Sequence, residues 1–344
     1  MENVNLFISV FIFILGACIG SFLNVCIVRM PQNKSIVFPS SHCVKCNKPL
    51  AWRDNIPLLS YLFLGGRCRY CREIFSVRYF VVELLTAALF VTLFLQFGFS
   101  WVLLAYMIMV GGLIISTFID FEHRIIPDEI SLGGIVVGVV LSIFIPQMHE
   151  LEAWSLNIGK WMMWALVAIC FLEIMIGFFL KKDSVGKDDL IFMAVVAGLL
   201  VVDRGVSFWA FSLKDTPQAA LSLHLLSFQA SLIGFLVGGG LIYAMGVLGD
   251  ALFKKESMGG GDVKLLAMIG AFLGWKLSVL AFFIAPIFGA VFGIVEKIRT
   301  KDSAIAYGPF LSLGALISLL FGEAILAWVL GGYGIIYTNS LIPL

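Results

Sequence analysis

Long apolar runs separated by short charged clusters constrain the fold of this chain more than any other feature. A membrane-spanning helix needs about 20 apolar residues, and in lipid only helices and closed barrels satisfy every backbone hydrogen bond. The composition, 60% hydrophobic and 13% charged, is far from that of a soluble domain. We therefore predict an all-α polytopic membrane protein with about ten transmembrane helices. The apolar runs lie near residues 5–28, 78–97, 101–119, 130–146, 158–180, 188–202, 226–248, 263–276, 277–296 and 307–330.

The distribution of basic residues predicts the orientation of these helices. Residues 29–77 form a polar segment with many more Lys and Arg than Asp and Glu, a bias that marks the cytoplasmic side. Residues 1–4 lack the basic start of a cleavable signal peptide, so we expect the first apolar run to be a retained helix with its N-terminus outside. Alternation of the runs then brings four more polar segments to the cytoplasmic side: 121–129, 181–187, 253–262 and 297–301.

The overall charge excludes one class of partner. The formal net charge is only +1, and no basic stripe interleaved with aromatic residues is present. We therefore expect no nucleic acid partner, and the lipid bilayer is the partner that the apolar runs require.

Four cysteines in the segment 29–77 form two CxxC pairs, Cys43/Cys46 and Cys68/Cys71. Four thiolates are the ligand set of a closed, tetrahedral zinc site, which folds a loop and performs no catalysis. A reducing cytosol argues against disulfides. The pattern predicts a small cytoplasmic four-cysteine zinc-type loop, with a redox CxxC or metal-free thiols as alternatives.

Three consecutive glycines, Gly259, Gly260 and Gly261, precede Asp262 at the start of an apolar run. Glycine carries no Cβ, so it allows a close approach to a neighbouring helix. A carboxylate at the edge of a bilayer is costly and therefore indicates function. The alternative is a solvated aspartate that caps the next helix.

A second acid, Asp120, closes the apolar run that begins at Trp101. The alternative to a functional role for Asp120 is an interfacial aspartate paired with Arg124. Asp128, which follows Pro127, is interpreted as a helix N-cap. If the helices bearing Asp120 and Asp262 pack together, the two carboxylates can share one proton. The ionised acid can then activate water while the protonated acid polarises a peptide carbonyl, which is aspartic-protease chemistry.

An internal similarity complicates the choice of the second acid. Residues 181–189 parallel residues 254–262, and each segment leads into an apolar run. A duplication of a few helices explains this, and chance similarity between two Lys-rich turns is the alternative. Asp189 occupies the place of Asp262, but Lys187 and Asp188 replace the glycines there, so we prefer Asp262.

Several motifs, in this order, resemble the type IV prepilin leader peptidase/N-methyltransferase family of GxGD membrane aspartic proteases. They are Gly20-Ser21-Phe22-Leu23-Asn24-Val25 with Arg29 and Pro31, the paired CxxC loop, the run from Arg78 to Thr86, Asp120 to Asp128, Met258 to Leu265, and Tyr307-Gly308-Pro309-Phe310-Leu311. No single motif is specific, but their ordered succession is, and it covers most of the chain.

The resemblance implies that Asp120 and Asp262 are the catalytic pair. It implies removal of the leader from type IV prepilins and pseudopilins at the cytoplasmic face of the bacterial inner membrane. It also implies N-methylation of the new N-terminus with S-adenosyl-L-methionine as donor. No G-x-G-x-x-G motif is present, so the residues that bind the donor are not identified.

The resemblance also implies a domain organisation: residues 1–28 as the first transmembrane helix, 29–77 as the zinc-binding, methyltransferase-associated loop, and 78–344 as the peptidase domain. One departure from the family is the long separation of Asp120 from Asp262, because an extra segment near 181–253 intervenes.

Two further classes of function remain open. A secondary transporter also uses intramembrane acids and repeats, and a membrane scaffold can carry a zinc docking loop.

Overall fold

The computed structural model of this protein describes residues 2–43, 45–149, 151, 153–176, 198, 201–210, 212–213, 219–253, 258–300 and 306–331. Most of these residues are helical, as predicted, and pairing of extended segments within them is limited to isolated bridges. The predicted run 188–202 lies almost wholly outside the described residues. The segment 181–187 and Asp189 lie entirely outside them.

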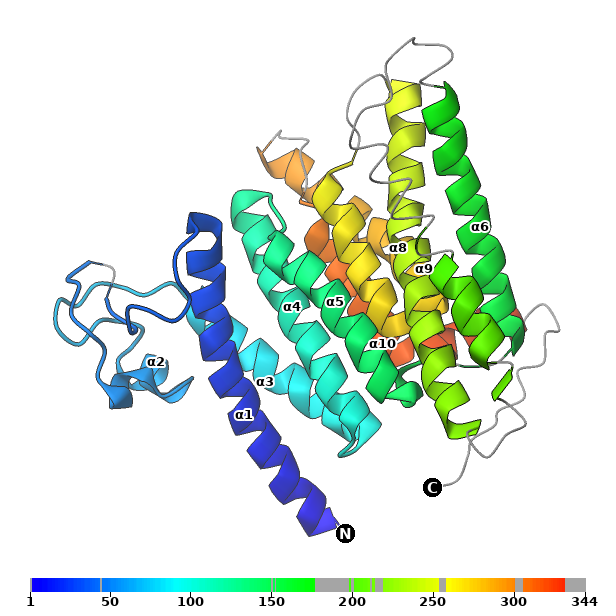
Figure 1. The fold of residues 1–344 in the computed structure, drawn as a ribbon. Helices are drawn as coiled ribbons and strands as arrows, with labels where there is room; N and C mark the ends of the chain where they lie inside the picture. Colours follow the sequence, from blue (N-terminus) through cyan, green and yellow to red (C-terminus); the bar gives the residue numbers. More distant parts are fainter. Residues whose placement is uncertain are drawn as a thin grey trace.

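Helices of very different length follow one another along the chain (Figure 1). The elements are α1 (Glu2–Arg29), η1 (Met30–Gln32), η2 (Trp52–Asn55), α2 (Leu59–Phe63), α3 (Arg78–Phe97), α4 (Trp101–His123), α5 (Asp128–Phe144), η3 (Pro146–Met148), α6 (Ala153–Ile176), α8 (Ala219–Phe253), α9 (Gly260–Thr300) and α10 (Gly308–Gly331).

Six helices within the described residues are long and apolar enough to cross a membrane. Their candidate spans are Asn5–Gln32, Arg78–Phe97, Trp101–His123, Leu221–Asp250, Gly260–Val295 and Gly308–Val329. Two predicted runs, 263–276 and 277–296, fall within the single helix α9. The helix is nevertheless broken near the end of the first run, because Gly274 has φ 76° and ψ 177°. The expected membrane class agrees with these spans, whereas the count of ten helices stays a prediction.

α1 and α3 pack closely because two glycines face α3. A Cβ on Gly16 would lie 2.7 Å from Cα of Ala87, and one on Gly20 would lie 2.7 Å from Cα of Glu83. Small residues at such spacing allow helix backbones to approach each other in membranes. One turn further along α1, the side-chain amide of Asn24 donates to the backbone carbonyl of Tyr79 over 3.0 Å. The two helices are thus held in a fixed register.

α4 runs through the interior and positions Asp120 at its end. The helix begins after Ser100, whose hydroxyl accepts from the backbone N–H of Leu103, and most of its length is buried. It ends at Arg124, which is left-handed (φ 55°) and donates its N–H to the carbonyl of Asp120 over 2.9 Å. Asp120 therefore lies in the last hydrogen-bonded turn of α4.

α8 and α9 make the closest helix contact near their glycines. A Cβ on Gly234 would collide with the carbonyl oxygen of Gly270, and one on Gly238 would lie 2.5 Å from the carbonyl oxygen of Leu266. α10 packs on the other part of α9, where a Cβ on Gly314 would lie 2.6 Å from the carbonyl oxygen of Ala281. The start of α9 lies beside the end of α4 and the start of α10.

The polar segment 29–77, which we call the cysteine loop, lies beside α1 and α3 at one edge of the molecule (Figure 1). Its two CxxC pairs occupy equivalent turns. In the first turn, the N–H of Cys43 donates to the backbone carbonyl of Lys48, and Asn47 has a left-handed backbone. In the second turn, the N–H of Cys68 donates to the backbone carbonyl of Glu73, and Arg72 has a left-handed backbone. The same turn is therefore built twice.

Candidate active site and metal centre

The four cysteines of the two turns converge. Their Sγ atoms all lie within 4.8 Å of one another, and Sγ of Cys43 is 3.7 Å from Sγ of Cys71. A tetrahedral metal with metal–sulfur bonds of about 2.3 Å needs sulfurs about 3.8 Å apart. The cluster Cys43, Cys46, Cys68 and Cys71 therefore fits a metal ion, as the spacing predicted.

Backbone donors favour the thiolate of Cys68, whereas burial and the neighbouring thiols raise the pKa of Cys71 to about 11. Hydrogen bonds from the backbone of Cys71 and Tyr70 lower the pKa of Cys68 to about 7. A thiolate, and not a thiol, is the form that binds a metal. Two contacts also join the turns: Lys45 pairs with Glu73 over 2.5 Å, and the Lys48 ammonium lies 4.8 Å above the ring of Tyr70.

An ion pair between an exposed arginine and a buried carboxylate connects the second turn to the rest of the cysteine loop. Arg69 donates through Nε and Nη2 to both carboxylate oxygens of Asp54, with the shortest distance 2.6 Å. The guanidinium lowers the pKa of Asp54, so this acid is ionised at neutral pH. The η2 helix, which carries Asp54, is therefore attached to the cysteine cluster.

Asp120 is a buried acid with a specific backbone partner. Only 6% of its surface is exposed, and its Oδ2 accepts the N–H of Gly308, the first residue of α10, over 3.0 Å. A Cβ on Gly308 would lie 2.7 Å from the same oxygen. Glycine is thus required for this contact. The sequence identified Gly308 only as part of a family motif and did not predict its hydrogen bond to Asp120.

Asp262 lies in the first turn of α9, half-buried, and its N–H donates to the carbonyl of Gly259 over 3.1 Å. It is close enough to Asp120 for the two charges to act on each other. The tertiary structure thus brings together the two acids that the sequence singled out.

The three glycines before Asp262 do not share one role. A Cβ on Gly261 would lie 3.2 Å from Cβ of Ile126, which is a close approach. Gly260 has no described atom within 4 Å of such a Cβ, and Gly259 would meet only Asp262 at 3.6 Å. The expected close packing therefore applies to Gly261. Ile126 also lies against Gly308, so one side chain contacts both the glycine that precedes Asp262 and the glycine that binds Asp120.

Tyr307 completes the surroundings of the acids. Its buried hydroxyl has no hydrogen-bond partner among the described residues. Burial, and to a smaller extent the negative charge of Asp262, raise the pKa of Tyr307 to about 12. The phenol is therefore neutral beside Asp262 at physiological pH.

Asp128 has a different role from the one the sequence suggested. Pro127 occupies the N-cap of α5, and no side chain caps that helix. Asp128 instead pairs with Lys264 of α9 over 2.6 Å. The prediction of an N-cap was wrong because the carboxylate has an oppositely charged partner on a neighbouring helix. The pair joins α5 to the turn that carries Asp262.

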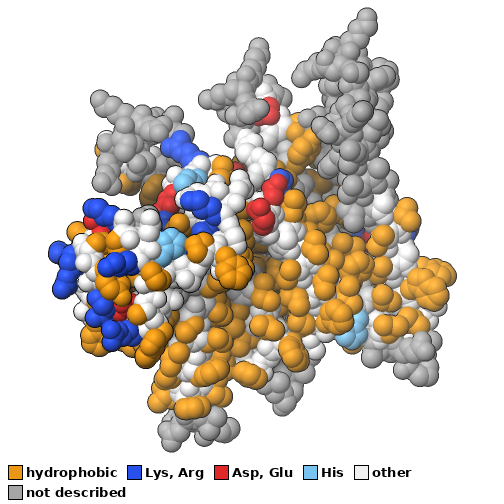
Figure 2. All heavy atoms as spheres, turned by 60° about the vertical axis from the view of Figure 1, so that its left-hand side comes forward, with side chains coloured by type: hydrophobic (Ala, Val, Ile, Leu, Met, Phe, Trp, Pro, Cys, Tyr) orange, Lys and Arg blue, Asp and Glu red, His pale blue; other side chains and the backbone are white. Residues whose placement is uncertain are grey.

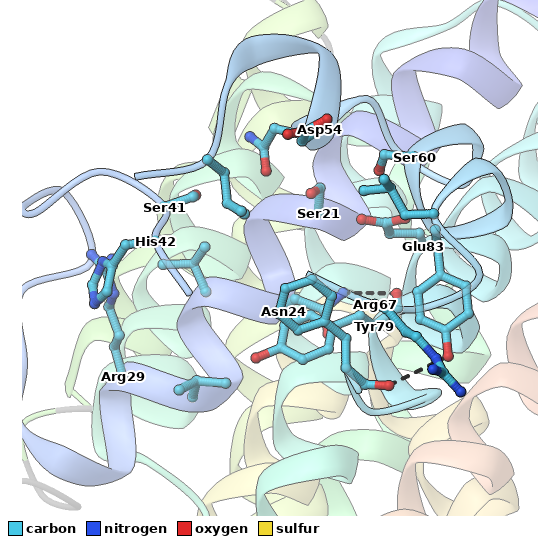
Figure 3. A pocket seen from close by; sticks show the side chains of 17 residues that line it. Ser21, Asn24, Arg29, Ser41, His42, Asp54, Ser60, Arg67, Tyr79 and Glu83 are labelled. Carbon is cyan, nitrogen blue, oxygen red and sulfur yellow. Dashed lines mark hydrogen bonds between the residues drawn. The ribbon is translucent and has the colours of Figure 1, made fainter. Parts of the chain in front are cut away.

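A cavity of about 190 Å³ lies between α1, the cysteine loop and α3. Figure 3 shows side chains of all three segments converging on it, among them Ser21, Asn24 and Glu83. Ser21 and Asn24 belong to the motif Gly20 to Val25, and Glu83 belongs to the run from Arg78 to Thr86. Nothing in the sequence indicated that they share a cavity.

Comparisons with known proteins cover nearly all of these features. Residues 14–97 match the model of the bacterial peptidase A24 N-terminal domain. Residues 107–214 and 206–294 match the model of the type IV leader peptidase family. Both acids and the cysteine cluster lie within the matched ranges. No solved structure matches the chain significantly.

Several curated relatives share one name. The chain is 32% identical over 292 residues to the "Prepilin leader peptidase/N-methyltransferase" of Myxococcus xanthus, covering 85% of this chain and 64% of the relative. Identity is 28% to the proteins of the same name from Aeromonas salmonicida and Pseudomonas aeruginosa. These alignments cover 93% and 91% of this chain, and 92% and 90% of the relatives.

Proposed function

The chain belongs to the type IV leader peptidase family, and on that premise we propose that it is a membrane aspartic endopeptidase that removes the leader peptide of type IV prepilins and pseudopilins. It then N-methylates the new N-terminus, with S-adenosyl-L-methionine as methyl donor. The transporter and scaffold alternatives lose their support, because neither accounts for the matched family or the shared name of the relatives.

Asp120 and Asp262 are the catalytic pair in this proposal. The observation that carries it is the convergence of a buried acid at the end of α4 with an acid at the start of α9. Two carboxylates at short range share one proton and titrate as a unit. The ionised member takes a proton from water, whose oxygen attacks the peptide carbonyl, while the protonated member donates to the carbonyl oxygen.

Gly308 is a positioning residue for this chemistry. Its N–H holds Oδ2 of Asp120, so one oxygen of that acid is oriented before substrate binds. Gly261 and Ile126 keep the start of α9 against the end of α4, which maintains the separation of the two acids. Gly259 and Gly260 supply the unobstructed turn before Asp262.

The cysteine cluster holds structural Zn²⁺ in this proposal. Four protein thiolates saturate a tetrahedral ion, so the metal has no open position for water or substrate. Its contribution is to fold the cysteine loop and, through Arg69 and Asp54, to fix η2.

The active site faces the cytoplasm of a bacterial inner membrane in this proposal. Figure 2 shows Lys and Arg side chains gathered over the cysteine loop and hydrophobic side chains over the helices below it. Such a basic excess beside membrane spans is typical of the cytoplasmic side. Arg78, at the start of α3, pairs with Glu122 near the end of α4, which supports the same side for the loop and Asp120.

The test compares prepilin cleavage by purified wild type and the variants Asp120→Asn, Asp262→Asn and Asp189→Asn. We expect no cleavage with either of the first two and nearly normal cleavage with the third. Each variant replaces one oxygen by nitrogen, so binding and folding are disturbed little. Cleavage that survives loss of Asp120 or Asp262 would rule out the pair. If only Asp189→Asn abolishes cleavage, the second catalytic acid is Asp189, in the earlier copy of the repeat, and not Asp262.

A further inference from the structure

We propose that the cavity between α1, the cysteine loop and α3 binds S-adenosyl-L-methionine, with the donor's sulfonium cation beside Glu83. This assignment rests on the proposed N-methyltransferase function and adds the site that the sequence did not identify. Every residue that lines the cavity lies between Ser21 and Glu83. The whole cavity therefore falls within residues 14–97, which match a family model separate from that of the peptidase segments.

Glu83 supplies a buried negative charge to this cavity. It is 92% buried (8% exposed), and its Oε2 accepts the backbone N–H of Leu58 over 2.8 Å. The Ser21 hydroxyl also contacts this carboxylate. A carboxylate held in this way, at the membrane end of a helix, is costly unless a cation is available. A bound sulfonium would provide that cation.

Asn24 supplies an acceptor with no partner. The side chain is only 2% exposed, and its Nδ2 is used on the carbonyl of Tyr79. Its Oδ1 has no hydrogen-bond partner among the described residues. Buried acceptors are nearly always satisfied, so one that lines a cavity indicates a missing donor. The ammonium group of the donor's methionine part offers N–H groups for it.

Three aromatic rings, Tyr61, Phe75 and Tyr79, also line the cavity, as do the basic side chains of Arg29 and Arg67. The centroids of Phe75 and Tyr79 are 6.5 Å apart with their planes 65° apart, so the rings do not stack flat on each other. Aromatic faces attract alkylated cations, as in sites for quaternary ammonium groups. A sulfonium that carries a methyl group is a cation of this kind. Carboxylate and rings together thus favour the charged donor over its neutral product.

The volume indicates how the donor is held. About 190 Å³ is less than the roughly 300–1,000 Å³ of pockets that enclose a whole drug-sized ligand. The cavity therefore encloses the cationic part of the donor, and the remainder lies at the entrance between α1 and the cysteine loop. Asp54 and Asn55 of η2 also line the cavity. Asp54 is held by Arg69, which lies in the chain between Cys68 and Cys71.

The position of the cavity suits methylation of a freshly cut N-terminus. Tyr79 and Glu83 lie in the first two turns of α3, and Asp120 lies in the last turn of α4. The Arg78–Glu122 ion pair holds these two helix ends together. Donor and aspartates are thus on one side of the membrane. When the amine attacks the methyl carbon, the carbon–sulfur electron pair returns to sulfur and leaves neutral S-adenosylhomocysteine, while the amine loses a proton to water.

The test measures binding of S-adenosylmethionine and S-adenosylhomocysteine to the purified full chain by titration calorimetry, without prepilin. Glu83→Gln should weaken binding of the charged donor by about 30-fold or more, since one partner of a buried charge pair is lost. Binding of the neutral product should change much less. Glu129→Gln, which removes an exposed acid at the start of α5 that does not line the cavity, is the control. Unchanged donor binding by Glu83→Gln, or equal loss for both ligands, would overturn the proposal.

A second measurement needs no variant. Ultraviolet cross-linking of methyl-labelled donor to wild type should place the label within residues 14–97, whereas label in α9 or α10 would overturn the site. The same preparation is assayed for cleavage and methylation of a prepilin. Failure of those reactions contradicts the proposed function, while normal methylation with label elsewhere contradicts only this site.

Discussion

The backbone N–H of Gly308 donates to Oδ2 of Asp120 over 3.0 Å, although 188 positions separate the two residues along the chain. The contact joins the start of α10 to the end of α4. It also leaves no room for a side chain, because a Cβ at this position would lie 2.7 Å from the carboxylate oxygen. The orientation of one proposed catalytic acid therefore depends on a glycine in a distant motif.

Gly308→Ala should impair cleavage without unfolding the protein. The added methyl group must displace Asp120 or the start of α10, and a displacement of about 1 Å in a catalytic group can cost about 100-fold in rate. We expect a fall of that order in kcat for prepilin cleavage. Gly289→Ala is the control, since its Cβ would make only ordinary contact with Phe310 at 3.6 Å. Equal rates for both variants would contradict the positioning role.

Tyr307 should contribute no ionisation to the pH dependence of cleavage. An ordinary tyrosine has a pKa near about 10, but burial and the charge of Asp262 raise that of Tyr307 to about 12. The ionised form is the one disfavoured, so the phenol stays neutral as the pH rises through 10. Rate profiles of wild type and Tyr307→Phe should therefore have the same shape on the alkaline side. A limb that disappears in the variant would show that Tyr307 titrates there.

The cysteine cluster should bind about one metal ion per chain. Elemental analysis of wild type should detect it, and Cys43→Ser combined with Cys68→Ser should abolish it. Cys18→Ser is the matched control, because Cys18 is an exposed cysteine of α1 outside the cluster. Wild type that contains no metal after gentle purification would show that the four thiols are metal-free.

The break in α9 should make Gly274 hard to replace. With φ 76° this residue adopts a backbone conformation that side chains disfavour, and its Cβ would lie 3.3 Å from Cδ2 of His149. Gly274→Ala should destabilise the protein by about 1–3 kcal/mol, measured as a lower Tm in detergent. Gly133→Ala, whose Cβ would meet no described atom within 4 Å, should leave the Tm unchanged or raise it.

Local patterns were sufficient for the class of fold and for the chemical groups of the site. Run length and apolar composition indicate membrane helices because the bilayer imposes both on each segment separately. Two CxxC pairs predict a thiolate cluster because the ligands of each pair are neighbours in the chain. Asp120 could be singled out because a carboxylate at the end of an apolar run is unusual wherever that helix packs. The choice of Asp262 over Asp189 stays a prediction.

Other features arise from contacts between distant segments, and no local pattern contains them. Gly308 matters because α10 meets the end of α4, and Asp128 pairs with Lys264 because α5 lies beside α9. Of the three glycines before Asp262, packing against Ile126 selects Gly261. Glu83 and Asn24 share a cavity only because Gly16 and Gly20 allow α1 to approach α3. Sequence thus determines which groups are present, whereas helix packing determines which of them meet.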